Sequence, residues 1–427
     1  MMLLLAFAQG AAYAQDRLIR GGVIYEFVQA GDNSAWKCTG YDSSDPSFPT
    51  DGVITILSEL ENVGEHDEPI PVTEIVEWAF NDKNNNVDTE DIHGVVIAEG
   101  IKVIGEYAFH RCIGITHLTL PSTIEYVGEG ALHCGDGLRW VDCRQVGQTW
   151  NQQLSTDDYI SIFGVSDYLM NLEYALLYMP SWWTKGETNV VITGASSGSS
   201  CQEWHYSRNM DYCIPDGFTA EKITVRQKLA ADDGAYSVCL PYSLPIPQGA
   251  KAYSLMKRDD TDVCFSQISG DMHPFKPYLI VASEEVTLDC GEQREILTTE
   301  AAEALLTSDQ ANRVTLRGTF RRINYDVASA GSFYVLQSEN LWKRVGGGYT
   351  HVGVSPFRVY LTLDASGAAS VQTTLIDGTD AIALPVAPQA AAHAKNAWHT
   401  LQGQRLSAAP SQPGIYIHQG KKVVIER

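Results

Sequence analysis

The front half of the chain repeats one pattern of apolar and small residues. The phrase "IKVIGEYAFHRC", residues 101–112, returns as "IEYVGEGALHC", residues 124–134, with matching positions 23 residues apart. "VTEIVEWAF", residues 72–80, fits the same template 29 residues earlier, and the extra residues fall in the polar insertion "NDKNNNVDTEDIHG". A repeat of this length is typical of a solenoid, in which each unit buries its apolar face only by stacking on its neighbours.

Each repeat is expected to supply one strand and a set of core residues. The runs "HGVVIAEG" and "THLTLPST" precede the phrase, and their alternation predicts strands with Val96 and Leu118 facing inward. Glycine in the phrase suits a tight turn, because it has no Cβ to oppose an unusual φ. The predicted repeat core consists of Ile101, Ile104, Gly105, Ala108, Phe109, Cys112, Ile124, Gly128, Ala131 and Leu132.

These residues resemble the BspA-like leucine-rich repeats of bacterial surface proteins. The family pattern I-x-x-I-G-x-x-A-F-x-x-C, with an L-x-L-P strand before it, matches "IKVIGEYAFHRC" and "LTLPSTIEYVGEGAL", whereas "VTEIVEWAF" has Val76 in place of the glycine. The resemblance covers roughly residues 20–185 and implies a short leucine-rich-repeat solenoid. It also implies a surface protein that attaches to host proteins or to other bacteria.

Beyond the solenoid, the chain has regularly spaced runs of aromatic and β-branched residues, which predict strands of an antiparallel sandwich. The runs are "EKITVRQKL", "AYSVCLPYSLPI", "KAYSLMKR", "DVCFSQIS", "YLIVASEEVTL", "RVTLRGTFRRI", "SFYVLQS" and "FRVYLTL". One stretch, "EILTTEAAEALLTSDQ", is expected to be helical. The order of the strands also resembles the β-rich module that often follows repeat domains in secreted proteins of gut and oral Gram-negative anaerobes.

The last segment, "GIYIHQGKKVVIER", predicts a hairpin of two alternating strands around Gln419-Gly420. Together with "WHTLQGQRL", it is similar to C-terminal sorting domains of the type IX secretion route, which implies a place on the cell surface. An accessory β-domain without a sorting role is the alternative. The stretch "AIALPVAPQAAAHAKN" before it has no periodic apolar face, so we expect a linker there.

The predicted fold class is mainly β: a short solenoid, a β-sandwich-like module and a small C-terminal β-domain. The expected divisions are a signal peptide at 1–14, the solenoid at 15–190, a linker at 191–220, the β-sandwich-like module at 221–378, an Ala/Pro linker at 379–396 and the sorting-like β-hairpin domain at 397–427.

Composition and the first residues favour a secreted protein. The first apolar segment is followed by Ala12-Tyr13-Ala14, an A-x-A cleavage pattern of signal peptides. No other segment approaches the roughly 20 apolar residues of a transmembrane helix. Thirty Lys and Arg against 52 Asp and Glu give a net charge of −22, which argues against nucleic acid or anionic lipid as partners. Nine cysteines, an odd number, allow disulfides and leave at least one thiol unpaired.

Four patterns have the residue types for chemistry or binding. Gly194-Ala195-Ser196-Ser197-Gly198 satisfies G-x-S-x-G, but no helix-forming run follows it, so a flexible loop is the better interpretation. "DKNNNVDTED" alternates Asp82, Asn84, Asn86 and Asp88 like a calcium loop, but it lacks the glycine and the final Glu, which favours a solvated insertion.

The other two patterns involve the repeat and the residues after it. His110 and His133 share a repeat position near Cys112 and Cys134, which suggests a zinc-type ligand set, a disulfide between the two cysteines, or plain core thiols. Core thiols are favoured over metal. The aromatic residues after the solenoid would bind sugars or proteins if exposed, and would seal a domain junction if buried, which is the favoured interpretation. They are Trp182, Trp183, Trp204 and Tyr206.

The sequence therefore predicts a non-enzymatic protein, secreted or on the outer cell surface, without cofactor or metal. Its repeat surface would bind a protein or glycan ligand of a host or bacterial surface. The alternatives are a secreted hydrolase of glycans or peptides, for which no nucleophile–base or carboxylate constellation is evident, and a structural envelope component without a specific ligand.

Overall fold

The computed structural model of the chain is mainly β, which confirms the predicted fold class, and it divides into two compact units, Met1–Ile376 and Asp377–Arg427. The structure describes residues 17–28, 35–60, 69–81, 89–135, 137–148, 174–183, 188–194, 198–231, 234–258, 262–337, 340–346, 352–364, 369–377 and, for the backbone alone, 398–400, 405–406, 414–418 and 421–425.

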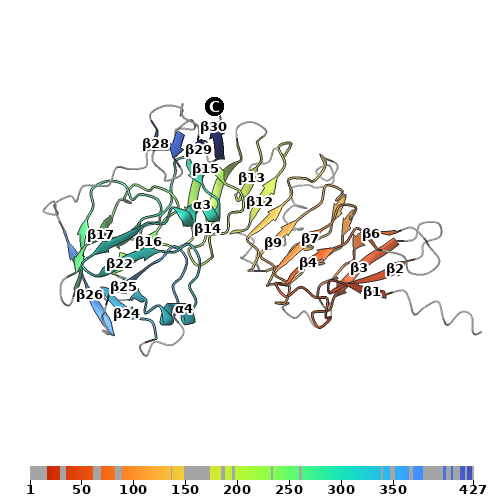
Figure 1. Cartoon of the computed structure of the whole chain (residues 1–427), viewed down its shortest axis with the longest axis horizontal. Helices are drawn as coiled ribbons and strands as arrows, with labels where there is room; N and C mark the ends of the chain where they lie inside the picture. The colour runs from red at the N-terminus through yellow and green to blue at the C-terminus, as the bar shows by residue number, and fades with distance from the viewer. Residues whose placement is uncertain are drawn as a thin grey trace, which may run out of the picture. The chain divides into compact units, whose positions relative to one another are not determined.

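The first unit begins with a solenoid in which two ladders of strands run side by side along the coils (Figure 1). One ladder contains β1 (Arg17–Arg20), β2 (Val23–Val28), β3 (Ala35–Tyr41), β5 (Glu59–Leu60), β6 (Ile70–Ile75), β8 (Val103–Ile104) and β10 (Tyr126–Val127). The other contains β4 (Val53–Ile56), β7 (Gly94–Ile97), β9 (His117–Thr119), β11 (Trp140–Asp142), β12 (Leu176–Met179), β13 (Val190–Ile192), β14 (Ser200–Tyr206), β15 (Phe218–Val225) and β20 (Arg294–Ile296).

Strand pairing reproduces the repeat spacing of the sequence. Leu118 pairs in parallel with Val95 on one side and with Val141 on the other, each 23 residues away. In the other ladder Ile104 pairs with Ile75, 29 residues earlier, and with Val127, 23 residues later. The predicted register of the coils is therefore confirmed, but a coil contributes two strands and not one, because the repeated phrase itself is extended at β8 and β10.

The core of the solenoid is formed by the apolar positions of the phrase. Ile101, Ile104, Ala108, Phe109, Cys112, Ile124, Ala131 and Leu132 are at most 1% exposed. Phe109 stacks on Phe80 of the preceding coil, with ring centroids 4.8 Å apart. The expectation that Val96 faces inward is wrong: Val96 is 45% exposed, and Val95, which pairs with Leu118, faces the core instead.

The two glycines of the phrase have a different role from the expected tight turn. Neither has a left-handed φ, but a Cβ on Gly105 would lie 2.4 Å from Glu77 N, and one on Gly128 would lie 2.5 Å from Glu106 N. Real Cβ atoms do not approach backbone so closely, so glycine is required here because successive coils touch. The left-handed turn comes two residues later in each coil.

The segment 191–220, expected to be a linker, continues the second ladder. β14 pairs antiparallel with β13 and parallel with β15, which pairs antiparallel with β20. The residues of β14 alternate between exposed and buried, and the buried Cys201, Trp204 and Tyr206 belong to the core of the following module. The solenoid sheet therefore runs directly into that module.

The module is built on a third sheet that folds over on itself. Its strands follow the order β16 (Ala235–Cys239), β19 (Pro277–Ala282), β17 (Ala250–Arg258), β18 (Asp262–Gln267), β26 (Ser370–Ile376), β24 (Leu341–Arg344), β23 (Tyr334–Gln337), β25 (Val359–Leu363), β22 (Val314–Gly318) and β21 (Ser308–Ala311). Because β16 contacts β25 and β17 contacts β21 and β22, the two halves of the path face each other, as in a sandwich.

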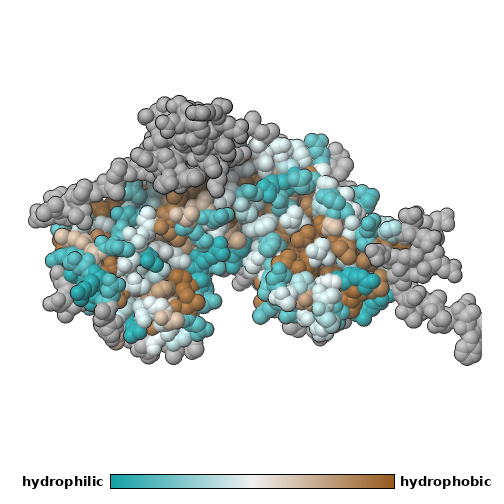
Figure 2. Space-filling model, in the orientation of Figure 1, coloured by the Kyte–Doolittle hydropathy of each residue, from teal (hydrophilic) through white to brown (hydrophobic). Residues whose placement is uncertain are grey.

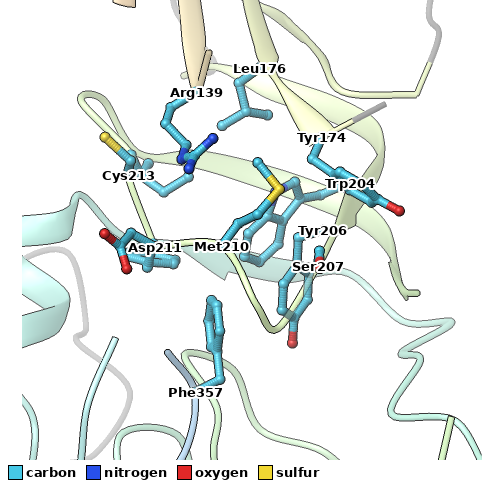
Figure 3. Close-up of a pocket in the computed structure, with 12 residues that line it drawn as sticks. Arg139, Tyr174, Leu176, Trp204, Tyr206, Ser207, Met210, Asp211, Cys213 and Phe357 are labelled. Carbon is cyan, nitrogen blue, oxygen red and sulfur yellow. The ribbon is translucent and has the colours of Figure 1, made fainter. Parts of the chain in front are cut away.

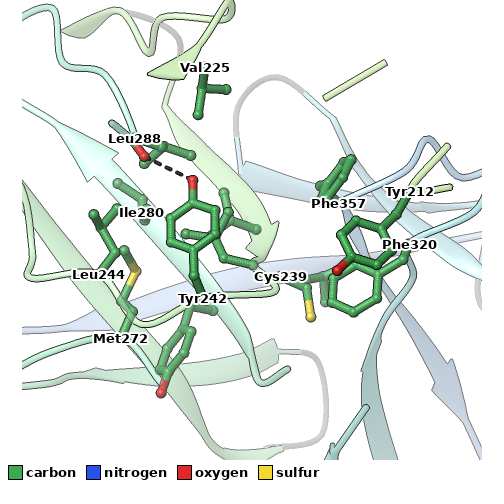
Figure 4. Packing of buried hydrophobic residues seen from close by; sticks show 14 of the residues in the cluster. Tyr212, Val225, Cys239, Tyr242, Leu244, Met272, Ile280, Leu288, Phe320 and Phe357 are labelled. Atoms are coloured by element: carbon green, nitrogen blue, oxygen red, sulfur yellow. Dashed lines mark hydrogen bonds between the residues drawn. The ribbon is translucent and has the colours of Figure 1, made fainter. Parts of the chain in front are cut away.

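Each of the eight runs predicted to be strands contains one, although "EKITVRQKL" belongs to β15 of the solenoid ladder. Tyr242, Leu244 and Ile280 lie close together in the apolar core between the two halves, and Tyr212, Phe320 and Phe357 gather beside them (Figure 4). Tyr242 satisfies its buried hydroxyl by donating to the carbonyl of Leu288, at 3.0 Å.

Two short helices are attached to the module, α3 (Thr299–Ala304) and α4 (Tyr325–Ala330). α3 is much shorter than the predicted helical stretch, whose two ends form β20 and β21. It begins where the side chain of Thr298 accepts a hydrogen bond from Ala301 N, which satisfies one of the free amides of the first turn.

The second unit contains a small antiparallel sheet in the order β28 (Arg405–Leu406), β27 (Trp398–Thr400), β29 (Gly414–His418) and β30 (Lys421–Ile425). β29 and β30 pair from Gly414 with Ile425 to His418 with Lys421. That pairing leaves two residues, 419 and 420, to connect the strands, as the hairpin prediction requires.

Candidate functional site

Two of the four candidate patterns, Ser196 with its G-x-S-x-G motif and the segment Asp82–Asp88, have residues that lie outside the described part of the chain. Of the residues that flank Ser196, Gly194 donates its backbone N–H to the carbonyl of Gly198 at 3.2 Å. In the described part of the chain, no group of three or more His, Cys, Asp or Glu side chains could hold a metal ion.

The histidines and cysteines of the repeat separate into two layers. His110, which is half-buried, and His133, which is 4% exposed, approach each other with 2.8 Å between their Nδ1 atoms, as the shared repeat position predicts. Cys112 and Cys134 lie instead in the core, and both are free thiols, so the disulfide considered between them is absent. Cys112 donates to the carbonyl of Phe80 at 3.5 Å.

Burial also makes these thiols chemically inert. None of the nine cysteines forms a disulfide, and burial raises the pKa of Cys38 to about 12 and lifts the pKa of Cys112 and Cys134 well above the ordinary range. A thiol that stays protonated is a poor nucleophile and a poor metal ligand.

The aromatic residues after the solenoid are mostly buried. Trp183 is 3% exposed and packs in the solenoid core, against which Trp182 also lies. Trp204 and Tyr206 are buried in the module core, with ring centroids 4.5 Å apart. Their position favours the interpretation that they seal the junction, since little of their surface is left for a ligand.

A pocket lies at this junction, where the ladder passes into the module (Figure 3). Arg139 and Asp211 lie on one side of it and Tyr174 and Trp204 on the other, with Met210 between them. The pocket is small and partly open, with a volume of about 30 Å³. Asp211 accepts a hydrogen bond from Arg322 N at 2.7 Å, so its carboxylate holds the backbone of a segment distant in the sequence.

A more extensive feature is a row of rings on the turn side of the solenoid, which we call the turn ladder: Trp78, Tyr107, His110 and His133. Trp78 stacks on Tyr107 with centroids 4.9 Å apart, and His110 meets both rings edge-on, at 5.2 and 5.6 Å. The ring of His133 lies 4.7 Å from that of His110. Three successive coils therefore contribute to one row of rings, in which Trp78, Tyr107 and His110 are half-buried and His133 is buried.

The backbone of the turn ladder is held in an uncommon conformation. Trp78 and Tyr107 have φ values of 57° and 54°, and the equivalent position of the next coil is Gly130, with φ of 60°. A left-handed φ costs a residue with a Cβ about 1–2 kcal/mol, which glycine avoids. Two coils thus keep a large aromatic residue where glycine would be easier, and strain of this kind is concentrated at functional sites.

A row of carboxylates runs along the turn ladder. Glu77, Glu106 and Glu129 occupy the same repeat position, directly before the left-handed residue, and all three are exposed. The hydroxyl of Tyr107 donates to Glu129 at 3.1 Å; burial first, and then this hydrogen bond, raise the pKa of Tyr107. The surface therefore offers ring edges beside negative charge.

The outer face of the second ladder is a further apolar surface. Figure 2 shows hydrophobic residues gathered over β4, β7 and β9, where Val96 is 45% exposed. His117 and Trp140, which pair in neighbouring strands, stack with centroids 4.8 Å apart. This face carries fewer rings than the turn ladder and no backbone strain at its strand positions.

Sequence reasoning did not identify the turn ladder. The signal was available, because Trp78, Tyr107 and Gly130 are separated by the same 29 and 23 residues as the core positions. Their chemical types differ, however, and only the backbone conformation unites them.

Comparisons with known proteins add a limited likeness. No family model and no curated protein matches the chain. Among solved structures, it is similar to a leucine-rich repeat protein from Bacteroides capillosus ATCC 29799, at 20% identity over 30% of this chain and 96% of that one, with a TM-score of 0.20. It is also similar to a leucine rich cell surface protein from Faecalibacterium prausnitzii A2-165, at 14% identity over 45% of this chain and 64% of that one, with a TM-score of 0.17. These scores are too low to establish a shared fold, so the solenoid assignment rests on the strand register described above.

Proposed function

We propose that this is a non-enzymatic, secreted or cell-surface protein whose repeat solenoid binds a protein ligand on a host or bacterial surface. The observation that supports the proposal most is the turn ladder, in which Trp78 and Tyr107 keep strained backbone positions and stack on each other. Backbone strain at positions that do not pack in the core is typical of functional sites. Aromatic anchors are the side chains most often responsible for binding energy in protein interfaces.

The buried solenoid core supports the same proposal. Phe80 and Phe109 are at most 1% exposed and stack beneath the ladder, so the rings above them stand on a rigid base. A preorganised surface loses little side-chain freedom when a partner binds. In the described residues, by contrast, the pocket offers the half-buried thiol of Cys213 and the carboxylate of Asp211, which accepts a backbone hydrogen bond, and it contains no nucleophile–base pair.

Surface location is part of the proposal. The C-terminal hairpin resembles a type IX sorting tail, and the Ala-Tyr-Ala pattern near the start resembles a cleavage site. No helix in the described part of the chain is long and apolar enough to cross a membrane. We propose that the last domain directs the protein to the outer surface, where the solenoid meets its ligand.

A cell-binding measurement tests the ligand-binding proposal. Fluorescently labelled protein would be titrated onto epithelial or bacterial cells, with and without prior protease treatment of those cells. We expect saturable binding that protease treatment abolishes, and a loss of about 30-fold in affinity for the Trp78→Ala, Tyr107→Ala double variant, the size expected of a hot spot of about 2 kcal/mol.

The control is Tyr126→Ala, because Tyr126 is an exposed aromatic residue of the same solenoid, at 46% exposure, outside the turn ladder. Its affinity should change by less than about twofold. Thermal unfolding of all variants would show that each is folded. Equal binding by the double variant and the unchanged protein would contradict the role of the turn ladder, and binding that survives protease would contradict a protein ligand.

A further inference from the structure

Two arginines, Arg208 and Arg358, contact neighbouring residues of β16 in the β-module, and neither pairs with a carboxylate of the described residues. Arg208, which follows β14, is only 2% exposed. Its guanidinium makes one long hydrogen bond, from Nη2 to Ser237 O at 3.4 Å, and its Nε has no partner among the described residues. An arginine side chain has five N–H donors, so most of its hydrogen-bonding capacity is unused here.

Arg358 reaches the same place from the opposite half of the sheet. It precedes β25, and its guanidinium lies 5.9 Å from the ring centroid of Tyr236. The next residue, Val359, donates its backbone N–H to the hydroxyl of Ser237 at 3.3 Å. Arg208 therefore contacts Ser237, and Arg358 lies against Tyr236, the preceding residue of β16.

The electrostatics of the pair are unfavourable as they stand. Burial, and then the positive charge of Arg358, lower the pKa of Arg208 to about 9; burial also lowers the pKa of Arg358. Neither arginine forms an ion pair with a carboxylate of the described residues. A buried, unpaired charge is strongly destabilising, and protein interiors normally compensate it with an opposite charge.

The neighbouring hydroxyls do not supply the missing acceptor. Tyr206 and Tyr242 share a hydrogen bond of 2.9 Å between their Oη atoms, and Tyr242 also interacts with the carbonyl of Leu288. Ser237 Oγ accepts from Val359 N. A negatively charged partner for Arg208 would have to be small, because this side chain is almost fully enclosed.

We propose that Arg208 and Arg358 hold a small inorganic anion of halide size against Tyr236 and Ser237, and that this anion stabilises the junction of the solenoid ladder with the β-module. The position explains the role: Arg208 continues from β14 of the ladder, whereas Tyr236 and Arg358 belong to the module. An anion shared by both arginines would join the two parts.

Thermal unfolding in different salts tests the proposal. At constant ionic strength, sodium gluconate would be replaced stepwise by sodium chloride. We expect the unfolding midpoint to rise with chloride concentration and to level off in the way that ligand binding to the folded state predicts. The chloride response should disappear in Arg208→Met and in Arg358→Met. Arg226→Met is the matched control, because Arg226 is exposed and lies over the ring of Tyr174, and it should keep the response.

A second measurement does not depend on the variants being folded. Crystals of the unchanged protein would be soaked in sodium bromide, and we expect an anomalous peak between Arg208 and Arg358. Absence of that peak, an unfolding midpoint of the unchanged protein that is the same in both salts, or an equal chloride response in Arg208→Met would each overturn the proposal. Asp232 and Asp233 lie outside the described residues; loss of stability in Asp232→Asn or Asp233→Asn without any chloride response would assign the counter-charge to the chain itself.

Discussion

Tyr107 shows how a single residue of the turn ladder combines several constraints. Its backbone is left-handed, its ring stacks on Trp78, and the same ring occupies the space of a Cβ on Gly130, which would lie 2.5 Å from it. Glycine in the third coil therefore relieves strain and also makes room for the aromatic side chain of the second. The composition of one coil is explained only by the side chains of its neighbour.

The histidine pair makes the stability of the solenoid depend on pH. Burial, and then the charge of Arg111, lower the pKa of His133 below its ordinary value of 6.5. The 2.8 Å contact between the Nδ1 atoms of His110 and His133 needs one donor and one acceptor, so protonating both rings would bring two N–H groups face to face. The unfolded chain therefore binds protons more readily than the folded one.

We expect the contribution of the histidine pair to the free energy of unfolding to be fully present above about pH 6.5. It should be lost as the pH falls through the lowered pKa of His133. The unfolding midpoint of the unchanged protein should fall between pH 7.5 and 5.5, and His133→Gln should flatten that dependence. His117→Gln is the comparison variant, because burial also lowers the pKa of His117, away from the histidine pair. An unaltered pH profile in His133→Gln would assign the effect elsewhere.

At the level of single residues, the sequence predicted the core and missed the surface. Ile104, Phe109 and Leu132 were identifiable because burial requires one chemical property, apolarity, at a fixed spacing. Val96 was misassigned by one position, since both residues of the pair Val95-Val96 are apolar and alternation alone cannot choose between them. Trp78 and Tyr107 occupy the turn ladder because their backbone has a left-handed φ. The residue type alone does not reveal that conformation.

At the level of elements, the spacing of the coils depends on two glycines. A Cβ on Gly105 would lie 2.4 Å from Glu77 N and 2.6 Å from Val76 C, both backbone atoms that cannot rotate away. We expect Gly105→Ala to lower the free energy of unfolding by about 1–3 kcal/mol, as other overpacked sites do. Denaturant unfolding followed by circular dichroism would measure the change.

The control for that variant is Gly291→Ala. A Cβ at Gly291 would meet no atom within 4 Å, and its φ is not left-handed, so the change in free energy should stay within about 0.5 kcal/mol. If Gly105→Ala and Gly291→Ala were equally stable, the close approach of coils at this position would be wrong.

Strand partners were harder to predict than strands. β14 has the alternating burial of a strand, but the predicted linker at 191–220 included it, and its Trp204 and Tyr206 were expected to seal a domain junction. "EKITVRQKL" was recognised as a strand, yet it joins the solenoid ladder through β14. Which edge a strand joins is decided by packing between distant segments, and a single sequence does not contain that information.

At the level of the whole molecule, the solenoid and the module act as one unit. Arg144, after β11, forms ion pairs of 2.6 Å with Asp142 and 2.5 Å with Asp216, in the loop before β15. Tyr178 of β12 donates to the carbonyl of Asp216 at 2.8 Å. These contacts and the continuous ladder explain why Met1–Ile376 forms a single compact unit, whereas the sequence suggested two domains and a linker.

The C-terminal unit, by contrast, should be separable from the rest of the chain. Residues from Asp377 onward form their own compact unit, and the first part of this unit, residues 379–396, has the Ala/Pro composition of a tether. If the last domain carries the sorting signal, deleting residues 397–427 should leave the unfolding midpoint of the first unit unchanged while the protein accumulates in the periplasm instead of reaching the cell surface.

Replacing residues 379–396 by a Gly/Ser segment of equal length should leave surface display intact, because a tether needs length and not a particular sequence. Protease accessibility on intact cells, together with fractionation, would measure both results. Normal display of the deletion variant would refute the sorting role and would make the sheet of β27 to β30 an accessory domain.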